Sequence, residues 1–466
     1  MEAAPSAHPR NQAGDIHVSE LPMETGAIRA KVMSLAGPAL VEMSLMTLVM
    51  MVDMMMVGRL GPWAITSVGL SNQPMFFAMA MFMALNVGTT ALVARFVGGK
   101  EMDRASDAAR QSLLLTVGLG LLLSLVLFVS AAGILRLMGA RPEVLAPGTS
   151  YFRIASVGLF FSAINMSMAA VLRGAGDMKT PMRVNVVANI INVAGNALLI
   201  HGLLGFPRWE VAGAAVATAV SRLVACLMTL AVVYSGRFVI KLSPGDRYRL
   251  DREIVGRIFR VGIPAAVEQF VMRGGQMIFA RIVASLGTTI YAAHQIALNV
   301  ESLSFMPGFA FAMACTTLVG QSLGAGRADL AERCARETRR FGLLIMSTMG
   351  LMFFFFGRQV IMLYTSDAQV LQEGAQVLRI IALVQPALAS NFILAGALRG
   401  AGDTRWVLYA TFTGIWGIRI GLAYVLAIVV GWGLMGAWVA MALDMCVRAL
   451  LVYGRFRSGR WKEIGV

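Results

Sequence analysis

Apolar residues run along the chain in twelve long stretches that are separated by short polar segments. The stretches are continuous rather than alternating, which predicts helices and excludes the short alternating strands of an outer-membrane barrel. About 20 helical residues cross a bilayer of about 30 Å. We expect membrane spans at residues 32–57, 66–94, 112–132, 151–172, 184–204 and 211–234, and again at 262–285, 290–319, 341–356, 377–398, 407–430 and 434–453.

The two sets of six spans are two copies of one unit. The hexapeptide Leu-Arg-Gly-Ala-Gly-Asp stands at residues 172–177 and again at 398–403, an offset of 226 (172 + 226 = 398). The same offset brings Glu42 onto Glu268 without any net insertion. Polar and glycine identities in a fixed register indicate an internal duplication. We therefore expect an all-α integral membrane protein with twelve transmembrane helices, in two pseudo-symmetric six-helix lobes around a central cavity.

Composition agrees with a location in the membrane. Hydrophobic residues make up 58% of the chain and charged residues 14%, with a mean hydropathy of +0.71, which is outside the range of soluble domains. The net charge of +15 comes largely from Lys and Arg in loops on one side, where they face anionic lipid head groups, so nucleic acid is not an expected partner. We expect a bacterial-type cytoplasmic (inner) membrane. The positive-inside rule predicts that both termini lie in the cytoplasm.

Five segments follow from these patterns. We expect a disordered cytoplasmic tail over residues 1–30, which has no signal-peptide core. An N-terminal lobe covers 31–235, a basic cytoplasmic linker 236–260, a C-terminal lobe 261–455, and a cytoplasmic tail 456–466. The four cysteines and four histidines are scattered, so the sequence predicts no disulfide framework, no metal site and no cofactor.

Carboxylates within the spans are the main functional candidates, since each charge costs about 2.5 kcal/mol or more at a helix centre unless it faces protein or water. Glu42 and Asp53 in the first span are eleven residues apart and thus only about 20° apart around the helix. A buried carboxylate can exchange a proton, or hold Na⁺ and a cationic substrate in competition; alternatively, a neighbouring helix simply satisfies it. We favour function for Asp53, whose counterpart is Phe279. For Glu42, repeated as Glu268, a role in the common fold is equally compatible.

The fifth span carries asparagines at steps of four, three and four residues, which places them on one helical face: Asn185, Asn189, Asn192 and Asn196. Their amides could join helices, present oxygens to an ion, or bind a carboxylate. The counterparts of Asn192 and Asn196 are the apolar Ile418 and Leu422, which argues against a joining role common to both lobes. We expect this face to meet Asp53 within the N-terminal lobe.

Further charges lie in other spans. The candidates for acidic groups in the cavity are Glu42, Glu268 and Glu301. Asp444 and Arg448 are four residues apart on the last span and most simply pair with each other. Arg273 and Arg419 could snorkel, pair with one of these glutamates, or line the cavity. The 32 methionines, many of them in the first two spans, supply adaptable apolar surface.

Several motifs together resemble the multidrug and toxic compound extrusion (MATE) family. They are the repeated hexapeptide, Gly-Ile-Pro-Ala-Ala-Val-Glu at 262–268, Ala-Ser-Leu-Gly at 284–287, Ala-Ala-His-Gln-Ile-Ala at 292–297 and Phe-Met-Pro-Gly at 305–308. The resemblance covers about residues 30–455. It implies alternating access and the efflux of amphipathic, often cationic small molecules in exchange for H⁺ or Na⁺. We expect a monomer among membrane lipids.

The resemblance extends to single positions. Residues 52–58 match the family's first-span aspartate motif. Asn192 and Asn196 fall where the DinF-like branch carries an Asn and often an Asp, so Asn196 is a departure that removes one carboxylate. The acids that the NorM-like branch uses in its seventh and tenth spans fall at Met272 and about Leu388. The resemblance thus implies a DinF-like chain with coupling concentrated in the first lobe. Together with the asparagine face of the fifth span, this gives four candidate ion-coupling residues: Asp53, Asn189, Asn192 and Asn196.

Two other functions stay open. The same superfamily includes flippases for lipid-linked precursors, but these need a basic central cavity to hold pyrophosphate, and the acidic candidates above favour the opposite charge. A membrane-embedded enzyme needs clustered acid, base or metal groups at one membrane depth, and the sequence predicts no such cluster. The sequence does not choose between H⁺ and Na⁺.

Overall fold

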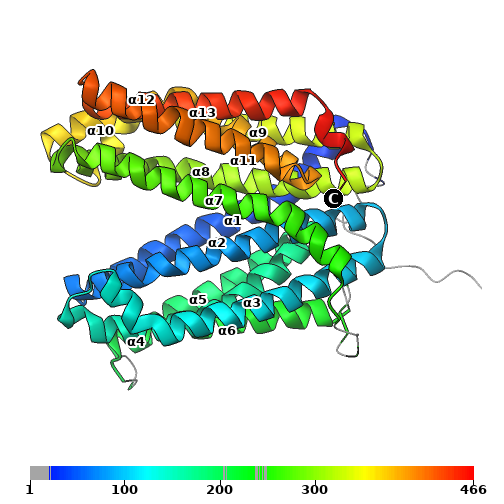
Figure 1. The fold of residues 1–466 in the computed structure, drawn as a ribbon, viewed down its shortest axis with the longest axis horizontal. Helices are drawn as coiled ribbons and strands as arrows, with labels where there is room; N and C mark the ends of the chain where they lie inside the picture. Colours follow the sequence, from blue (N-terminus) through cyan, green and yellow to red (C-terminus); the bar gives the residue numbers. More distant parts are fainter. Residues whose placement is uncertain are drawn as a thin grey trace, which may run out of the picture.

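The computed structural model describes residues 20, 22–202, 205, 207–236, 240, 242–243, 245 and 249–465. These residues form long helices joined by short loops (Figure 1). The first lobe contains α1 (Thr25–Gly58), α2 (Pro62–Gly98), α3 (Met102–Leu137), α4 (Pro142–Gly174), α5 (Lys179–His201) and α6 (Glu210–Tyr234). The second contains α7 (Arg252–Ala284), α8 (Thr288–Gly324), α9 (Ala328–Met362), α10 (Ala368–Ala401), a composite span of α11 (Thr404–Phe412), η3 (Thr413–Arg419), α12 (Ile420–Tyr424) and η4 (Val425–Val429), then α13 (Gly433–Arg457) and η5 (Arg460–Glu463).

The helices confirm the predicted twelve-span fold. Eleven helical segments in the described part of the chain are long and apolar enough to cross a membrane. The twelfth, α7, has a similar length but carries more charge, including Arg257, Arg260 and Arg273. Most helices are longer than the predicted spans because their polar ends continue the helix beyond the apolar stretch. For example, α3 begins at Met102, ten residues before the predicted span.

The chain ends differ from the predicted tails. Helix α1 begins at Thr25, within the predicted tail 1–30, of which residues 1–19 and 21 lie outside the described part. The C-terminal segment is anchored: Trp461 is fully buried and stacks on Phe456. Its indole nitrogen donates to the carbonyl oxygen of Phe456 at 2.8 Å. A buried aromatic ring with a satisfied N–H fixes this segment against the second lobe.

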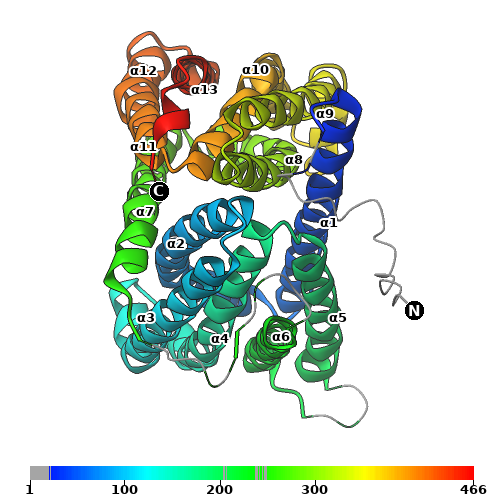
Figure 2. The ribbon, with the colours of Figure 1, turned by 90° about the vertical axis from the view of Figure 1, so that its right-hand side faces the viewer.

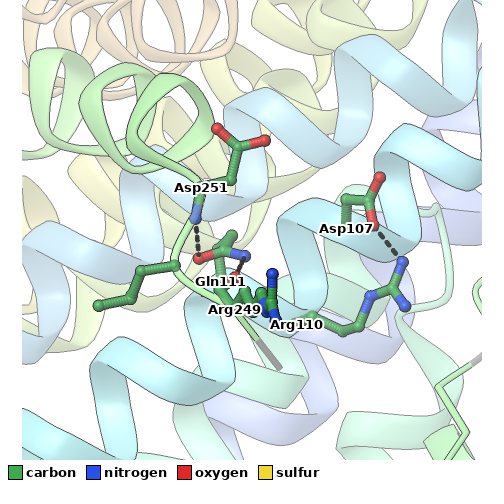
Figure 3. A pocket seen from close by; sticks show the side chains of 6 residues that line it. Asp107, Arg110, Gln111, Arg249 and Asp251 are labelled. Carbon is green, nitrogen blue, oxygen red and sulfur yellow. Dashed lines mark hydrogen bonds and ion pairs between the residues drawn. The ribbon is translucent and has the colours of Figure 1, made fainter. Parts of the chain in front are cut away.

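The predicted linker 236–260 overlaps the first turns of α7, and it docks on α3 through Gln111. The amide nitrogen of Gln111 donates to the carbonyl oxygen of Arg249 at 2.7 Å, and its oxygen accepts the backbone N–H of Asp251 at 3.1 Å (Figure 3). The Asp251 carboxylate in turn accepts the backbone N–H groups of Glu253 and Ile254, which caps α7. Helix α7 therefore starts where the chain is fixed to the first lobe. Linker residues 237–239, 241, 244 and 246–248 lie outside the described part.

The lobes meet at one end of the bundle, which we name the basic end. It carries the α2–α3, α4–α5, α8–α9 and α10–α11 loops and the first turns of the helices that follow them. These hold Lys100, Arg104, Lys179, Arg327, Arg333 and Arg405 among others. Helices α1 and α2 diverge from α7 and α8 toward the opposite end, at the left of Figure 1. The lobes therefore touch at the basic end and separate away from it.

Two glycines allow this contact. A Cβ on Gly98 of α2 would lie 1.9 Å from the carbonyl oxygen of Gln321 in α8, and a Cβ on Gly324 of α8 would lie 2.0 Å from that of Arg95 in α2. The two contacts are related by the repeat offset (98 + 226 = 324; 95 + 226 = 321), so they are reciprocal. Only glycine permits so close a backbone approach.

Helices α1 and α7, which open the two lobes, each cross to the other lobe near the basic end. Val32 of α1 belongs to the same buried cluster as Phe311 of α8. Symmetrically, a Cβ on Gly262 of α7 would lie 2.5 Å from the carbonyl oxygen of Ala84 in α2. Figure 2 shows α1 and α7 at opposite edges of the molecule, between the lobes. The two lobes are thus tied by an exchange of their first helices.

Candidate functional site

The asparagine face of α5 meets Asp53 of α1 inside the first lobe. The amide nitrogen of Asn196 donates to Oδ1 of Asp53 at 2.7 Å. In the orientation of the Asn192 amide that satisfies its neighbours, its nitrogen donates to both Asp53 oxygens, at 2.9 and 3.1 Å, and its oxygen accepts from Thr218 at 3.0 Å. Both asparagines are buried, whereas Asp53 is half-buried. Helices α1, α5 and α6 therefore converge on one carboxylate that keeps some access.

Three further side chains complete this site, and the sequence analysis did not single them out. Thr218 and Arg222 are one turn apart on α6, and the Arg222 guanidinium and the Asp53 carboxylate interact electrostatically. Tyr151 of α4 is also within electrostatic range of Asp53. The repeat register offered a signal for one of them, because Arg222 recurs as Arg448.

One amide oxygen of the site has no hydrogen-bond partner among the described residues. It is Oδ1 of Asn196, which is buried. Its amide nitrogen is already engaged by Asp53, so this oxygen is available to a proton donor or a cation. Carboxylate, amide and hydroxyl oxygens are the ligands that hard cations prefer. The arrangement can therefore hold either a proton on Asp53 or a small cation beside it.

The other two asparagines of the face have different surroundings. Asn189 is half-buried, and the hydrogen bonds between described residues do not join it to Asp53. Asn185 lies three turns from Asn196 and donates to Oε1 of Glu42 at 2.7 Å. The predicted face thus serves two carboxylates, one near each end of α5.

Glu42 is held by the arginine of the repeated hexapeptide. Nη2 of Arg173 donates to Oε1 of Glu42 at 2.7 Å, and Glu42 is only 6% exposed. This contact joins the end of α4 to the middle of α1. The hexapeptide arginine is therefore a fixed part of the first lobe rather than a free loop charge.

The second lobe repeats this arrangement. Nη2 of Arg399 donates to both oxygens of Glu268, at 2.8 and 2.9 Å, and Thr411 takes the place of Asn185 (185 + 226 = 411), at 3.2 Å. Glu42 and Glu268, which the sequence suggested as acidic groups of the cavity, are thus each buried and paired with an arginine in this structure. Their charge consequently gives no reason against a basic cavity.

A third acidic candidate, Glu301, lies inside the second lobe. It is 1% exposed, and its Oε1 has no hydrogen-bond partner among the described residues. Arg419 and Arg448 interact with it electrostatically. Glu301 is thus buried among the helices of one lobe rather than exposed on a cavity wall.

Most of the remaining intramembrane charges pair within the second lobe. Nε of Arg448 lies 2.8 Å from Asp444, as the sequence predicts, and Nη2 of Arg419 lies 2.7 Å from the same carboxylate. Asp444 is the counterpart of Thr218 (218 + 226 = 444). Arg273 instead stacks over the ring of Phe76 in the other lobe, at 5.6 Å. Where the first lobe presents an accessible carboxylate, the second has a closed ion-pair cluster.

Two six-helix lobes that meet at one end, with a polar site inside one of them, define a membrane transporter of the alternating-access class. The MatE family model matches residues 38–198 and 264–425, once in each lobe. The chain belongs to the multidrug and toxic compound extrusion (MATE) family. This family consists of transport proteins, in agreement with the prediction that the chain is not an enzyme.

Individual relatives support the assignment over nearly the whole length. The chain is 34% identical to the probable multidrug resistance protein NorM of Thermotoga maritima, with 95% of both chains covered. It is 29% identical to the multidrug resistance protein PmpM of Pseudomonas aeruginosa, with 94% of both covered. Its fold is similar to that of an outward-facing multidrug resistance MATE family transporter, with a TM-score of 0.87 at 24% identity over 97% of this chain and 98% of that one.

Proposed function

We propose that this protein is a secondary active multidrug efflux antiporter of the cytoplasmic membrane. It exports amphipathic, often cationic compounds in exchange for H⁺ or Na⁺ by alternating access, as a monomer with the basic end in the cytoplasm. The names of its relatives support the efflux of drugs, and the charge of the basic end supports this orientation.

The observation that carries the proposal is the Asp53 site. Asp53 is a carboxylate that the first lobe has and the second lacks, since Phe279 occupies the equivalent position. It keeps partial access while Asn192 and Asn196 fix its position. A carboxylate that is held in this way and remains reachable can exchange an ion with the outside.

Coupling follows from the connection between Asp53 and α5. A proton or a cation on Asp53 changes the strength of the hydrogen bonds that its carboxylate accepts from α5. The packing of α1 against α5 therefore differs between the loaded and the empty site. A ligand shifts a conformational equilibrium only through such differential contacts. Exposed methionines on the same stretch of α1, Met50, Met51, Met54 and Met55, offer an adaptable surface for varied apolar substrates.

We infer in addition that coupling is concentrated in the first lobe, as in the DinF-like branch. The positions of the NorM-like acids hold Met272 and Leu388, neither of which can carry a charge. The buried charges of the second lobe are largely occupied with one another around Asp444. Glu301 is buried within that lobe at 1% exposure, which leaves the half-buried Asp53 as the reachable carboxylate that supports ion exchange.

The test is the efflux of a fluorescent lipophilic cation from vesicles, with a pH gradient and a Na⁺ gradient imposed separately. We expect one of the two gradients to drive efflux in the native protein, and Asp53→Asn to reduce it to the level without a gradient. Asp329→Asn, the same change at an exposed carboxylate of the basic end, is the matched control and keeps full efflux.

The outcomes separate the alternatives. Full gradient-driven efflux by Asp53→Asn would remove this residue from the coupling mechanism. If neither gradient drives efflux by the native protein, a flippase for a lipid-linked precursor becomes the leading function, and fluorescent polyprenyl-phosphate lipids are the next substrates to measure.

A further inference from the structure

A cleft opens between α7 and α11 near the basic end. Its volume is about 560 Å³, and its lining includes Arg260, Ile263 and Val267 of α7 with Arg405, Leu408 and Tyr409 of α11. Figure 2 shows α7 at the left edge, leading from the first lobe up to α11. The cleft thus lies on the outer surface of the bundle, where lipid surrounds a membrane protein.

The cleft is amphipathic. Arg260 and Arg405 are exposed, and the ion pairs found between described residues do not include either of them. The acids close to the two arginines in sequence are already engaged, because Glu268 pairs with Arg399, Glu253 with Arg257, and Asp403 with Arg455. Two guanidinium groups therefore face this opening without an ion-pair partner in the part of the chain that the structure describes.

The rest of the lining is apolar and open to the surroundings. Ile263 is 55% exposed, Val267 41% and Tyr409 61%. These side chains lie one to two turns further along α7 and α11 than the arginines, on the side of the membrane centre. Charge at the end of the helices and exposed apolar surface below it match the two parts of a phospholipid.

We propose that this cleft binds the phosphate head group of an anionic phospholipid, with its acyl chains along Ile263, Val267 and Tyr409. Guanidinium groups bind phosphate oxygens through paired N–H donors. Basic side chains near a membrane surface attract anionic head groups, so two at one site favour an anionic over a zwitterionic lipid. The proposal does not depend on the efflux function.

The position of the cleft gives the lipid a structural effect. Gly262, whose backbone closely approaches Ala84 of the first lobe, lies between Arg260 and Ile263 on α7. A lipid that binds both arginines fixes this part of α7 against α11, while the opposite face of α7 contacts α2. Anionic lipid therefore stabilises the contact between the lobes at the basic end.

The experiment measures the thermal unfolding temperature of the purified full-length protein in detergent, with added phosphatidylglycerol or phosphatidylcholine. The variant is R260Q/R405Q, since glutamine keeps a polar, hydrogen-bonding end on the side chain and removes the charge. The matched control is K179Q/R183Q, two exposed basic residues at the basic end of α5, where Lys179 is the counterpart of Arg405 (179 + 226 = 405).

We expect phosphatidylglycerol to raise the unfolding temperature more than phosphatidylcholine in the native protein and in K179Q/R183Q, and this difference to fall by at least half in R260Q/R405Q. Native mass spectrometry should show retained phosphatidylglycerol with the same pattern. An equal lipid response in R260Q/R405Q, or an equal shift with inorganic phosphate alone, overturns the proposal. Because neither readout involves transport, this result and that of the efflux assay are independent.

Discussion

Equivalent positions in the two lobes carry different chemistry around a common backbone. Asp53 and Thr218 contribute to a polar site in the first lobe. Their counterparts differ: the ring of Phe279 lies under the guanidinium of Arg419, and Asp444 belongs to the ion-pair cluster. The hexapeptide arginines, by contrast, have the same role twice. Residues shared by both lobes thus build the fold, and residues that differ distinguish their functions.

Asn196 provides a test of this distinction. Asn196→Leu installs the residue that the second lobe has at Leu422, so we expect normal expression and folding. It removes a hydrogen bond to the charged Asp53 that is worth about 1.5–3 kcal/mol. Gradient-driven efflux at subsaturating driving ion should fall about tenfold or more in the vesicle assay.

Asn189→Leu, on the same face of α5 but not bonded to Asp53, serves as the control for that change. It should retain most of the efflux. Equal losses in both variants would mean that the face acts through helix packing and not through Asp53.

At the scale of helices, the contact between α2 and α8 depends on the absence of side chains. A Cβ at Gly98 or Gly324 would overlap a carbonyl oxygen of the other lobe. Forcing a side chain into a well-packed contact typically costs about 1–3 kcal/mol. The lobes can relieve this overlap only by moving apart at the basic end.

We therefore expect Gly98→Ala and Gly324→Ala to weaken the contact between the lobes. Hydrogen exchange followed by mass spectrometry should show faster exchange in the α2–α3 and α8–α9 loops. Gly118→Ala in α3, where an added Cβ has open space around it, is the control. Unchanged exchange in both interface variants would mean that these helices do not close the basic end.

The elements of this fold were more predictable from the sequence than the contacts between them. The twelve spans were predictable because continuous apolar stretches of this length are typical of membrane-spanning helices. The meeting of Asp53 with Asn196 was predictable because both lack polar counterparts in the second lobe. The pairing of Glu42 with Arg173 was missed although both recur in the repeat. The close approach of Gly98 to Gln321 could not be predicted from the sequence, because it depends on how the two folded lobes pack against each other.

At the scale of the whole molecule, the last residues of the chain tie the lobes together. Nη1 of Arg95, in the first lobe, donates to the carbonyl oxygen of Ile464 at 2.8 Å. Lys462 binds Glu332 of α9 at 2.5 Å, and Trp461 is buried beside Phe456. The C-terminal segment is thus part of the contact at the basic end.

Trp461→Ala should accordingly destabilise the protein. Replacing a fully buried tryptophan with alanine typically costs about 3–5 kcal/mol, and here it also loosens the segment that Arg95 holds. The unfolding temperature in detergent should drop clearly, whereas Trp432→Ala, at a ring that is 51% exposed, should change it little. Similar values for both variants would show that the segment does not contribute to stability.

The reciprocal approach of Gly98 and Gly324 also bears on the origin of the molecule. A contact in which each half offers the other the same surface is the geometry of an isologous homodimer. A half-length ancestor would therefore have paired with a second copy of itself through this same surface, and both copies would have carried the same residue at the position that Asp53 and Phe279 now share. Fusion into one polypeptide released the halves from that identity, so that one half can hold a carboxylate where the other holds a phenyl ring.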